Sequence, residues 1–226
     1  MTVTWTVVIP VKVLARAKSR LGVLAGSRRP ELALAMAADT VCAVLGCAEV
    51  GQVLVVTSDE VVGSFLAPLG VAVVGEDGPP ATSDSPRGEL EDRLNAALVH
   101  GAEVAARRWQ GNGIAALSAD LPALRPAELS RALRSAAAVA GGAAFVADEQ
   151  GIGTTLYTAA PGADFRPMFG GASRRRHAAD GVCELLLDGI PGLRRDVDTP
   201  EDLRTAVALG AGTRTMAVAG ELLDVA

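Results

Sequence analysis

The sequence predicts an α/β fold in which helices cover both faces of a mostly parallel β-sheet, giving a three-layer sandwich. Short runs rich in β-branched residues alternate with longer Ala- and Leu-rich segments along the 226 residues. Hydrophobic residues make up 50% of the chain and aromatic residues only 3%, so Val, Leu and Ala must build the core. Parallel strands buried on both faces have this composition. The length and the absence of an internal linker predict a single domain over 1–226.

Each expected element follows from a local pattern. Strands are expected at 5–10, 53–56, 71–74, 114–117, 143–147, 156–158 and 193–197. Helices are expected over 30–45, from 57–59 toward 66, and over 90–109, 126–139, 174–187 and 199–210. Thr199 and Pro200 are typical N-cap and N1 residues for the last of these, and Gly210 is a typical stop.

Two segments interrupt the alternation of strands and helices. Residues 75–88 are rich in Pro, Gly, Ser and Asp, so they are expected to form a surface loop or a flap over a site. Residues 148–177 are a candidate for a lobe that binds an acceptor and closes over it.

Composition excludes several classes of function. The net charge of −5 provides no basic field for nucleic acid. Cys42, Cys47 and Cys183 show neither a CxxC pair nor zinc-ligand spacing, which argues against a disulfide framework or a zinc site. The N-terminus has no basic leader, and no apolar stretch reaches the roughly 18 to 20 residues of a membrane span. We expect a cytoplasmic protein that binds neither nucleic acid nor membrane. Its oligomeric state stays open.

In open α/β sheets, ligands bind outside the carboxyl ends of the strands. The segment after the first expected strand is basic and contains Lys12, Arg16, Lys18, Ser19 and Arg20. Cations at this position can hold a triphosphate and neutralise the charge that develops on leaving pyrophosphate. The segment lacks the glycines of a Walker loop. An ordinary solvated basic loop is an equally good interpretation of these residues alone.

Carboxylates follow two other expected strands. Asp120 comes directly after the apolar run ending at Ala119, and Asp196 and Asp198 alternate along the final strand, which places both on one face. Neighbouring carboxylates repel each other unless a cation or proton lies between them, and Mg²⁺ prefers oxygen ligands. The three aspartates therefore form a candidate magnesium site. Alternatively, Asp120 is a turn residue and Asp198 a helix cap.

Two glycine-containing segments are candidates for binding an anionic acceptor. Residues 151–155 offer small side chains and two hydroxyls, and 169–177 form a glycine turn that leads into a basic helix start at Ser173. An ordinary N-cap role for Ser173, with solvated arginines, has equal weight. His100 and His177 have no triad signature, so neither receives a catalytic role.

Together these segments resemble a known family. IPVKVLARAKSRLG, VVTSD, LNAAL, LSADLPAL, GIGTT, FGGASRRRH and DVDTPEDL occur in the order found in the guanylyltransferases of coenzyme F-420 biosynthesis. The similarity runs from about 5 to 210. DLPAL and DVDTPEDL are shared with other nucleotidyltransferases, such as those acting on molybdopterin, whereas GIGTT and FGGAS narrow the resemblance.

The resemblance implies a Rossmann-like, GT-A-type nucleotidyltransferase that transfers GMP from GTP to the phosphate of phosphoenolpyruvate or 2-phospho-L-lactate. It implies metal ligands Asp120, Asp196 and Asp198, acceptor contacts from Thr154, Gly170 and Ser173, and nucleotide contacts from Lys12, Lys18, Arg20 and Asn95. Asp120, Lys18 and Arg20 would be the catalytic residues, with Mg²⁺ as cofactor.

The long 75–93 stretch departs from the family pattern and leaves the base-selecting residues open. The acceptor also stays open among phosphoenolpyruvate, 2-phospholactate and a phosphoglycerate, which one pocket can admit. Other possibilities are a CTP-dependent nucleotidyltransferase acting on molybdopterin or a sugar phosphate, and a non-catalytic nucleotide-binding regulatory protein.

Overall fold

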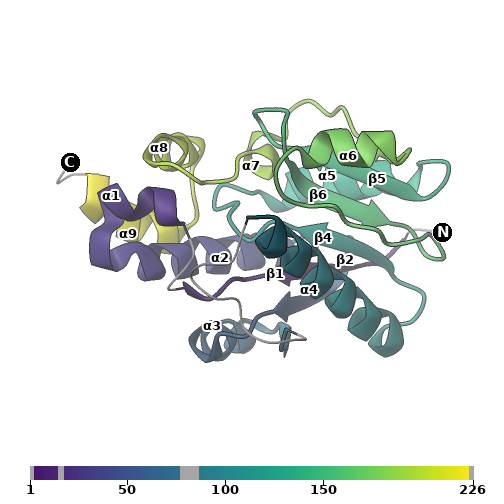
Figure 1. The fold of residues 1–226 in the computed structure, drawn as a ribbon, viewed down its shortest axis with the longest axis horizontal. Helices are drawn as coiled ribbons and strands as arrows, with labels where there is room; N and C mark the ends of the chain where they lie inside the picture. Colours follow the sequence, from purple (N-terminus) through teal and green to yellow (C-terminus); the bar gives the residue numbers. More distant parts are fainter. Residues whose placement is uncertain (1–2, 15–17, 77–86, 224–226) are drawn as a thin grey trace.

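A computed structural model describes residues 3–14, 18–76 and 87–223, and within them one seven-stranded sheet in the order β3-β2-β1-β4-β6-β5-β7 (Figure 1). The strands are β1 (Trp5–Pro10), β2 (Val50–Val56), β3 (Ala72–Val74), β4 (Gly113–Leu117), β5 (Ala143–Ala147), β6 (Thr154–Ala159) and β7 (Cys183–Glu184). Every neighbouring pair is parallel except the two that involve β6. The predicted α/β fold with a mostly parallel sheet is confirmed.

The antiparallel strand β6 decides what lies at the functional edge. It pairs with β4 so that Leu117 is opposite Leu156, and the Ser118 N–H donates to the Thr155 carbonyl at 2.9 Å. Because β6 runs in the opposite direction, its first residues lie beside the last residues of β4. The turn before β6 therefore meets the carboxyl end of β4.

Helices cover both faces of the sheet. One face packs on α2 (Arg29–Leu45), α3 (Glu60–Leu66) and α5 (Pro126–Ala137), and the other packs on α4 (Arg87–Arg108) and the region around α6 (Ser173–Ala179) (Figure 1). Inward residues of β1 alternate between the two cores, with Val7 and Ile9 on one side and Val8 on the other. This alternation explains why the strand is apolar throughout.

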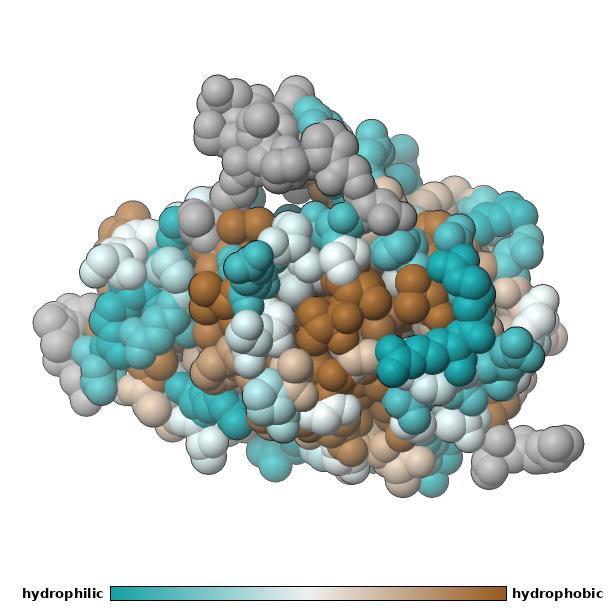
Figure 2. All heavy atoms as spheres, turned by 90° about the horizontal axis from the view of Figure 1, so that it is seen from below, coloured by the Kyte–Doolittle hydropathy of each residue, from teal (hydrophilic) through white to brown (hydrophobic). Residues whose placement is uncertain are grey.

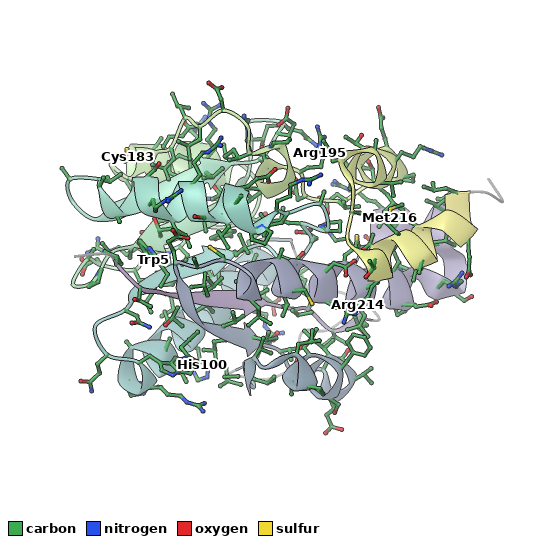
Figure 3. The ribbon with its side chains drawn as sticks, turned by 180° about the vertical axis from the view of Figure 1, so that it is seen from behind. Trp5, His100, Cys183, Arg195, Arg214 and Met216 are labelled. Atoms are coloured by element: carbon green, nitrogen blue, oxygen red, sulfur yellow. The ribbon has the colours of Figure 1, made fainter. Side chains whose placement is uncertain are left out.

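A third apolar cluster lies beyond the sheet, where α2 extends to meet α1 (Gly22–Ala25), α8 (Pro200–Leu209) and α9 (Thr213–Leu223) (Figure 1). Asp39 of α2 is buried there and accepts a 2.7 Å hydrogen bond from the Thr215 N–H. Arg214, labelled in Figure 3, lies with its guanidinium 3.5 Å from the same carboxylate. Asp39 thus holds the start of α9 against α2.

Two element predictions were wrong. The helix expected over 174–187 ends at Ala179, because Gly181 has φ 79° and the chain then forms β7. The strand expected over 193–197 is replaced by α7 (Pro191–Arg194) and an extended segment that leads to α8. The helix α9 was not predicted at all. The loop prediction for 75–88 falls largely on residues 77–86, outside the described part of the chain, and the proposed lobe at 148–177 stays a prediction.

Strand β3 forms one of the two edges of the described sheet, and its residues are only half-buried. The side of the molecule that carries α3 and β3 is seen from below in Figure 2, where apolar residues gather in the middle of the face. Val61 and Phe65 of α3 are exposed, at 61% and 44%. Among the helices described, none is long and apolar enough to cross a membrane.

Candidate active site

The basic loop after β1 is held by its neighbours on the sheet edge. Val11 N–H continues the pairing with β2 by donating to the Val56 carbonyl at 2.9 Å. The Leu14 N–H donates to Asp59 Oδ2 at 2.9 Å, while Oδ1 of the same carboxylate caps α3. The loop is therefore anchored at two points before residues 15–17, which lie outside the described part of the chain. Asp59, which the sequence marks only as a helix cap, performs both tasks.

Lys18 joins two of the predicted metal ligands. Its ammonium donates to the carboxylate of Asp120 and, at 2.7 Å, to Asp198 Oδ1. Only 13% of the Lys18 side chain is exposed. Burial disfavours the ammonium, but the two carboxylates outweigh that effect and raise the pKa of Lys18 above its ordinary value. Arg20 lies farther out, with Nη1 3.9 Å from Asp198 Oδ2.

Asp120 is positioned by backbone contacts on both sides. The next N–H, that of Leu121, donates at 3.0 Å to the buried hydroxyl of Thr40 on α2. The Asp120 carbonyl accepts a 3.1 Å hydrogen bond from the Val197 N–H. Val197 is fully buried, and its two aspartate neighbours remain partly exposed. This backbone hydrogen bond brings the segment that carries Asp196 and Asp198 beside Asp120 without a strand, and the predicted metal site itself stays a prediction.

The charges of the three aspartates interact. Burial, followed by the nearby carboxylates of Asp120 and Asp198, raises the pKa of Asp196 to about 7. Burial also opposes ionisation of Asp198, but Lys18 and Arg20 outweigh it and lower the pKa of Asp198. The shift at Asp196 therefore reflects its burial and the negative charge of its neighbours, and the shift at Asp198 reflects the nearby cations Lys18 and Arg20.

The residues fit a divalent cation in their chemistry. Carboxylate oxygens are the donors that Mg²⁺ prefers, and the Lys18 ammonium already lies as a cation between Asp120 and Asp198. In the described ranges no group of three or more His, Cys, Asp or Glu side chains is gathered closely enough to hold a metal as it stands. Binding of a metal would therefore require the ammonium to move and Asp196 to approach.

A cavity of about 480 Å³ opens beside this cluster. Of the residues predicted for the site, its lining includes Lys12, Lys18, Arg20, Asp120 and Asp198. Its lining does not include Asn95, Thr154, Gly170, Ser173 or Asp196. Phe169, which directly precedes Gly170, does line it. The glycine loop at 169–171 thus borders the same space as the basic loop.

Two of the predicted acceptor residues, Thr154 and Ser173, meet in a buried polar cluster. Ser173 Oγ donates to Thr154 Oγ1 at 3.1 Å, and His177 Nδ1 lies 3.0 Å from the same oxygen. The N-cap of α6 is Ala172, so Ser173 is not the N-cap residue that the alternative interpretation expected, and its hydroxyl bonds to Thr154. The hydroxyls of Thr154 and Ser173 come together although they are far apart in the sequence.

Gly170 has a backbone that requires glycine. Its φ is 99°, and a Cβ at this position would lie 2.5 Å from Cγ of Glu91 on α4. Non-glycine residues rarely adopt such a φ. The glycine therefore allows the loop to approach α4 closely.

Asn95 fastens this loop to α4. Its Nδ2 donates to the Phe169 carbonyl at 3.0 Å, and its Oδ1 accepts from the Phe169 N–H at 2.7 Å. Both ends of the amide are thus used by one backbone residue. The expected contact of Asn95 with the nucleotide stays a prediction. Its hydrogen bonds to Phe169 could not be predicted from the spacing of residues in the sequence.

The arginines of the predicted anion site are engaged elsewhere. Arg174 pairs with Glu184 at 2.9 Å and donates to the Gly151 carbonyl at 3.1 Å. Arg176 donates to the Met168 carbonyl at 3.2 Å and to that of Gly170. Both guanidinium groups brace the two glycine turns.

Asp148 is a residue of the site that sequence reasoning missed. Its carboxylate is buried and accepts hydrogen bonds from the Ile152 N–H at 2.8 Å and the Gly153 N–H at 2.7 Å. These bonds shape the turn that delivers Thr154. An aspartate a few residues before a glycine-rich turn is a recognisable signal for such a turn.

The fold places the chain with a known class of structures. Nucleotidyltransferase-type structures share this architecture: a Methanothermobacter nucleotidyl transferase, 23% identical, superimposes with a TM-score of 0.58 and covers 92% of this chain and 98% of its own. A Desulfovibrio desulfuricans protein, provisionally named a nucleotide-diphospho-sugar transferase, gives a TM-score of 0.67 at 16% identity and covers 98% and 94%.

The sequence is more specific than the fold. Residues 5–219 match the family described as guanylyl transferase CofC like, and the chain belongs to that family. A Streptomyces coelicolor protein named phosphoenolpyruvate guanylyltransferase is 54% identical to this chain over 220 residues, and the match covers 97% of each of the two chains. The Thermomonospora curvata protein of the same name is 52% identical over 219 residues and covers 97% of this chain and 90% of its own.

Proposed function

We propose that this protein is a magnesium-dependent guanylyltransferase that transfers GMP from GTP to the phosphate of phosphoenolpyruvate and releases pyrophosphate, in coenzyme F-420 biosynthesis in the cytoplasm. The observation that carries the proposal is the Lys18 ammonium bound to both Asp120 and Asp198 beside the cavity. The names of the relatives that are about half identical support the choice of acceptor.

The nucleotide side is assigned to the basic loop. Lys12 and Arg20 are exposed at the cavity and would turn toward a triphosphate. Lys18 would leave its two carboxylates and neutralise charge on the departing pyrophosphate. Asp120, Asp196 and Asp198 would hold Mg²⁺, which when bound supplies charge neutralisation and orients the phosphates.

The acceptor side is assigned to Thr154, Gly170 and Ser173. The hydrogen bond from Ser118 to Thr155 joins the start of β6, where Thr154 lies, to the end of β4, which Asp120 closely follows. An acid held there would present a phosphate oxygen to the α-phosphorus of GTP for in-line attack. One P–O bond forms, the bond to pyrophosphate breaks, and no covalent enzyme intermediate is needed. Catalysis then consists of positioning and electrostatic stabilisation.

The test is a matrix of donors and acceptors. The protein would be incubated with GTP, CTP, ATP or UTP together with phosphoenolpyruvate, 2-phospholactate or 3-phosphoglycerate, and released pyrophosphate would be measured. We expect release with GTP and phosphoenolpyruvate, with a new diphosphate signal by phosphorus NMR. Turnover with CTP and none with GTP would reject the donor, and no turnover in any combination would reject the enzyme.

The metal is tested separately. Removal of divalent ions with EDTA should abolish turnover, and Mg²⁺ should restore it. Asp120→Asn should lower kcat at least about 100-fold, as expected for the loss of a group that stabilises transition-state charge. Asp164→Asn, at an exposed carboxylate that pairs with Arg166, is the matched control and should leave kcat unchanged. Full activity of the Asp120 variant would refute the metal assignment.

A further inference from the structure

His177 is completely buried among aromatic rings. Its ring centroid lies 5.0 Å from that of Tyr157, 5.3 Å from that of Phe145 and 6.0 Å from that of Phe169. Burial, with a smaller effect of Arg176, lowers the pKa of His177 to about 4. The imidazole is therefore neutral at neutral pH, with one N–H donor and one acceptor nitrogen.

The hydrogen bonds determine which nitrogen carries the proton. The Met168 N–H donates to His177 Nε2 at 2.9 Å, so Nε2 is the acceptor. The proton of the neutral ring is then on Nδ1, which lies 3.0 Å from Thr154 Oγ1 and donates to it. The backbone amide of Met168, just before the glycine loop, thus sets the direction of the hydrogen bond on the other side of the ring.

The hydrogen bonds also determine the direction in which the Thr154 hydroxyl hydrogen points. Its oxygen accepts from His177 Nδ1 and from Ser173 Oγ, at 3.0 and 3.1 Å. Two donors occupy both lone pairs of this oxygen, so its one hydrogen must point away from them. A hydroxyl fixed in this way can only donate, which suits it to an anionic oxygen.

We propose that His177 is a positioning residue of the acceptor site, which orients the Thr154 hydroxyl as a hydrogen-bond donor to the phosphate or carboxylate of the acceptor acid. This inference rests on the proposed function, because Thr154 is assigned to the acceptor there. His177 acts through Thr154 and touches no reacting atom. Since it binds Met168 as well, it also keeps the loop before Gly170 in register with the start of β6.

Two substitutions of His177 distinguish the role of Nδ1 from that of Nε2. An asparagine amide can place an N–H close to the position of Nδ1, whereas a glutamine amide reaches the position of Nε2. His177→Asn and His177→Gln lose the same aromatic packing, so each is the matched control of the other. We expect His177→Asn to keep KM for phosphoenolpyruvate within about threefold, and His177→Gln to raise it about tenfold or more, as for a lost hydrogen bond to a charged ligand.

The KM for GTP should be unchanged in both variants, and both should show a cooperative melting transition. Thr154→Ala should raise KM for phosphoenolpyruvate, and adding His177→Gln to it should raise KM no further, because the histidine acts through that hydroxyl. Equal effects of the two His177 substitutions, or additive effects with Thr154→Ala, would overturn the inference.

A measurement that does not depend on turnover distinguishes this inference from the proposed function. Nitrogen NMR of labelled histidine in the wild-type protein should show a neutral His177 with its proton on Nδ1. A proton on Nε2 would overturn the positioning role even if the enzyme were active. If no acceptor is turned over, the proposed function fails, and this signal alone decides the orientation that His177 imposes.

Discussion

The Val197 N–H donates a 3.1 Å hydrogen bond to the Asp120 carbonyl, and this contact brings the DVD segment beside the end of β4. No strand pairing accompanies it. The buried Val197 side chain fixes the segment in the cluster formed with α2, α8 and α9, while the aspartates on either side point away from that core. The acidic site thus depends on helices that lie outside the sheet.

Removal of the Lys18 ammonium should make the aspartate cluster a better cation site. In Lys18→Met, Asp120 and Asp198 lose the charge that lies between them, so they repel each other. We expect the free energy of unfolding without metal to fall by about 1 to 3 kcal/mol. Added Mg²⁺ should raise the melting temperature of this variant more than that of the wild type. Equal responses to Mg²⁺ would contradict the assignment, and Lys12→Met, at an exposed side chain, is the control.

The close approach at Gly170 predicts a selective loss of stability. Gly162 has a similar positive φ of 84°, but a Cβ there would meet no atom within 4 Å. Gly162→Ala should therefore cost only the left-handed backbone strain, about 1 kcal/mol. Gly170→Ala should cost about 1 to 3 kcal/mol more, because its Cβ collides with Glu91. Chemical denaturation measures both, and equal losses would show that Glu91 moves aside freely.

Substitution of Asn95 should weaken binding of the acceptor rather than binding of the nucleotide. Asn95→Ala removes both hydrogen bonds to Phe169 and loosens the loop that carries Gly170. We expect KM for phosphoenolpyruvate to rise about tenfold while KM for GTP is unchanged. Steady-state kinetics with each substrate varied in turn would check this. A rise confined to KM for GTP would instead support the contact with the nucleotide that the family resemblance implies.

The buried His177 should make the protein less stable in acid. Its pKa is lowered from 6.5 to about 4 by burial, so between these pH values the unfolded chain binds a proton that the folded protein does not. The stability from this group is complete above pH 6.5 and falls as the pH is lowered to about 4, by about 3 kcal/mol in all.

Denaturation of the wild type and of His177→Asn across this pH range isolates the contribution. The comparison is needed because burial raises the pKa values of Asp196 and Glu128, which have the opposite effect on the pH dependence. The wild type should lose more stability than the variant between pH 7 and pH 4. If the free energy of unfolding depended on pH in the same way in both proteins, His177 would not be buried as a neutral ring.

Local patterns in the sequence were enough for much of the fold. Runs such as Trp5–Pro10 predict buried parallel strands, and the Thr199-Pro200 start with Gly210 predicts α8, whose capping box the structure confirms. The direction of β6 was not predictable, because a short apolar strand has the same pattern in either orientation. The false helix to 187 came from continuing a periodic pattern through Gly181, which ends it.

Site residues could be predicted where a charged side chain directly follows a strand. They were missed where a side chain contacts a segment that is distant in the sequence. Asp120 and the basic loop follow strands directly, so their meeting at one edge could be expected. The pairing of Asn95 with Phe169 and the use of Lys18 as a counter-ion arise from tertiary contacts between segments far apart in the chain. Residue spacing contains no information on such pairs.

The reversed direction of β6 has a consequence for how this protein family can diverge. In the proposed function two separate chain segments at the same edge of the sheet would serve the two substrates: the loop after β1 would serve the nucleotide, and the β5–β6 hairpin turn would serve the acceptor. Substitutions or insertions in that turn can alter the choice of acid without disturbing the loop that serves the nucleotide. Under the proposed assignment, acceptor preference and donor preference would then evolve separately in one scaffold.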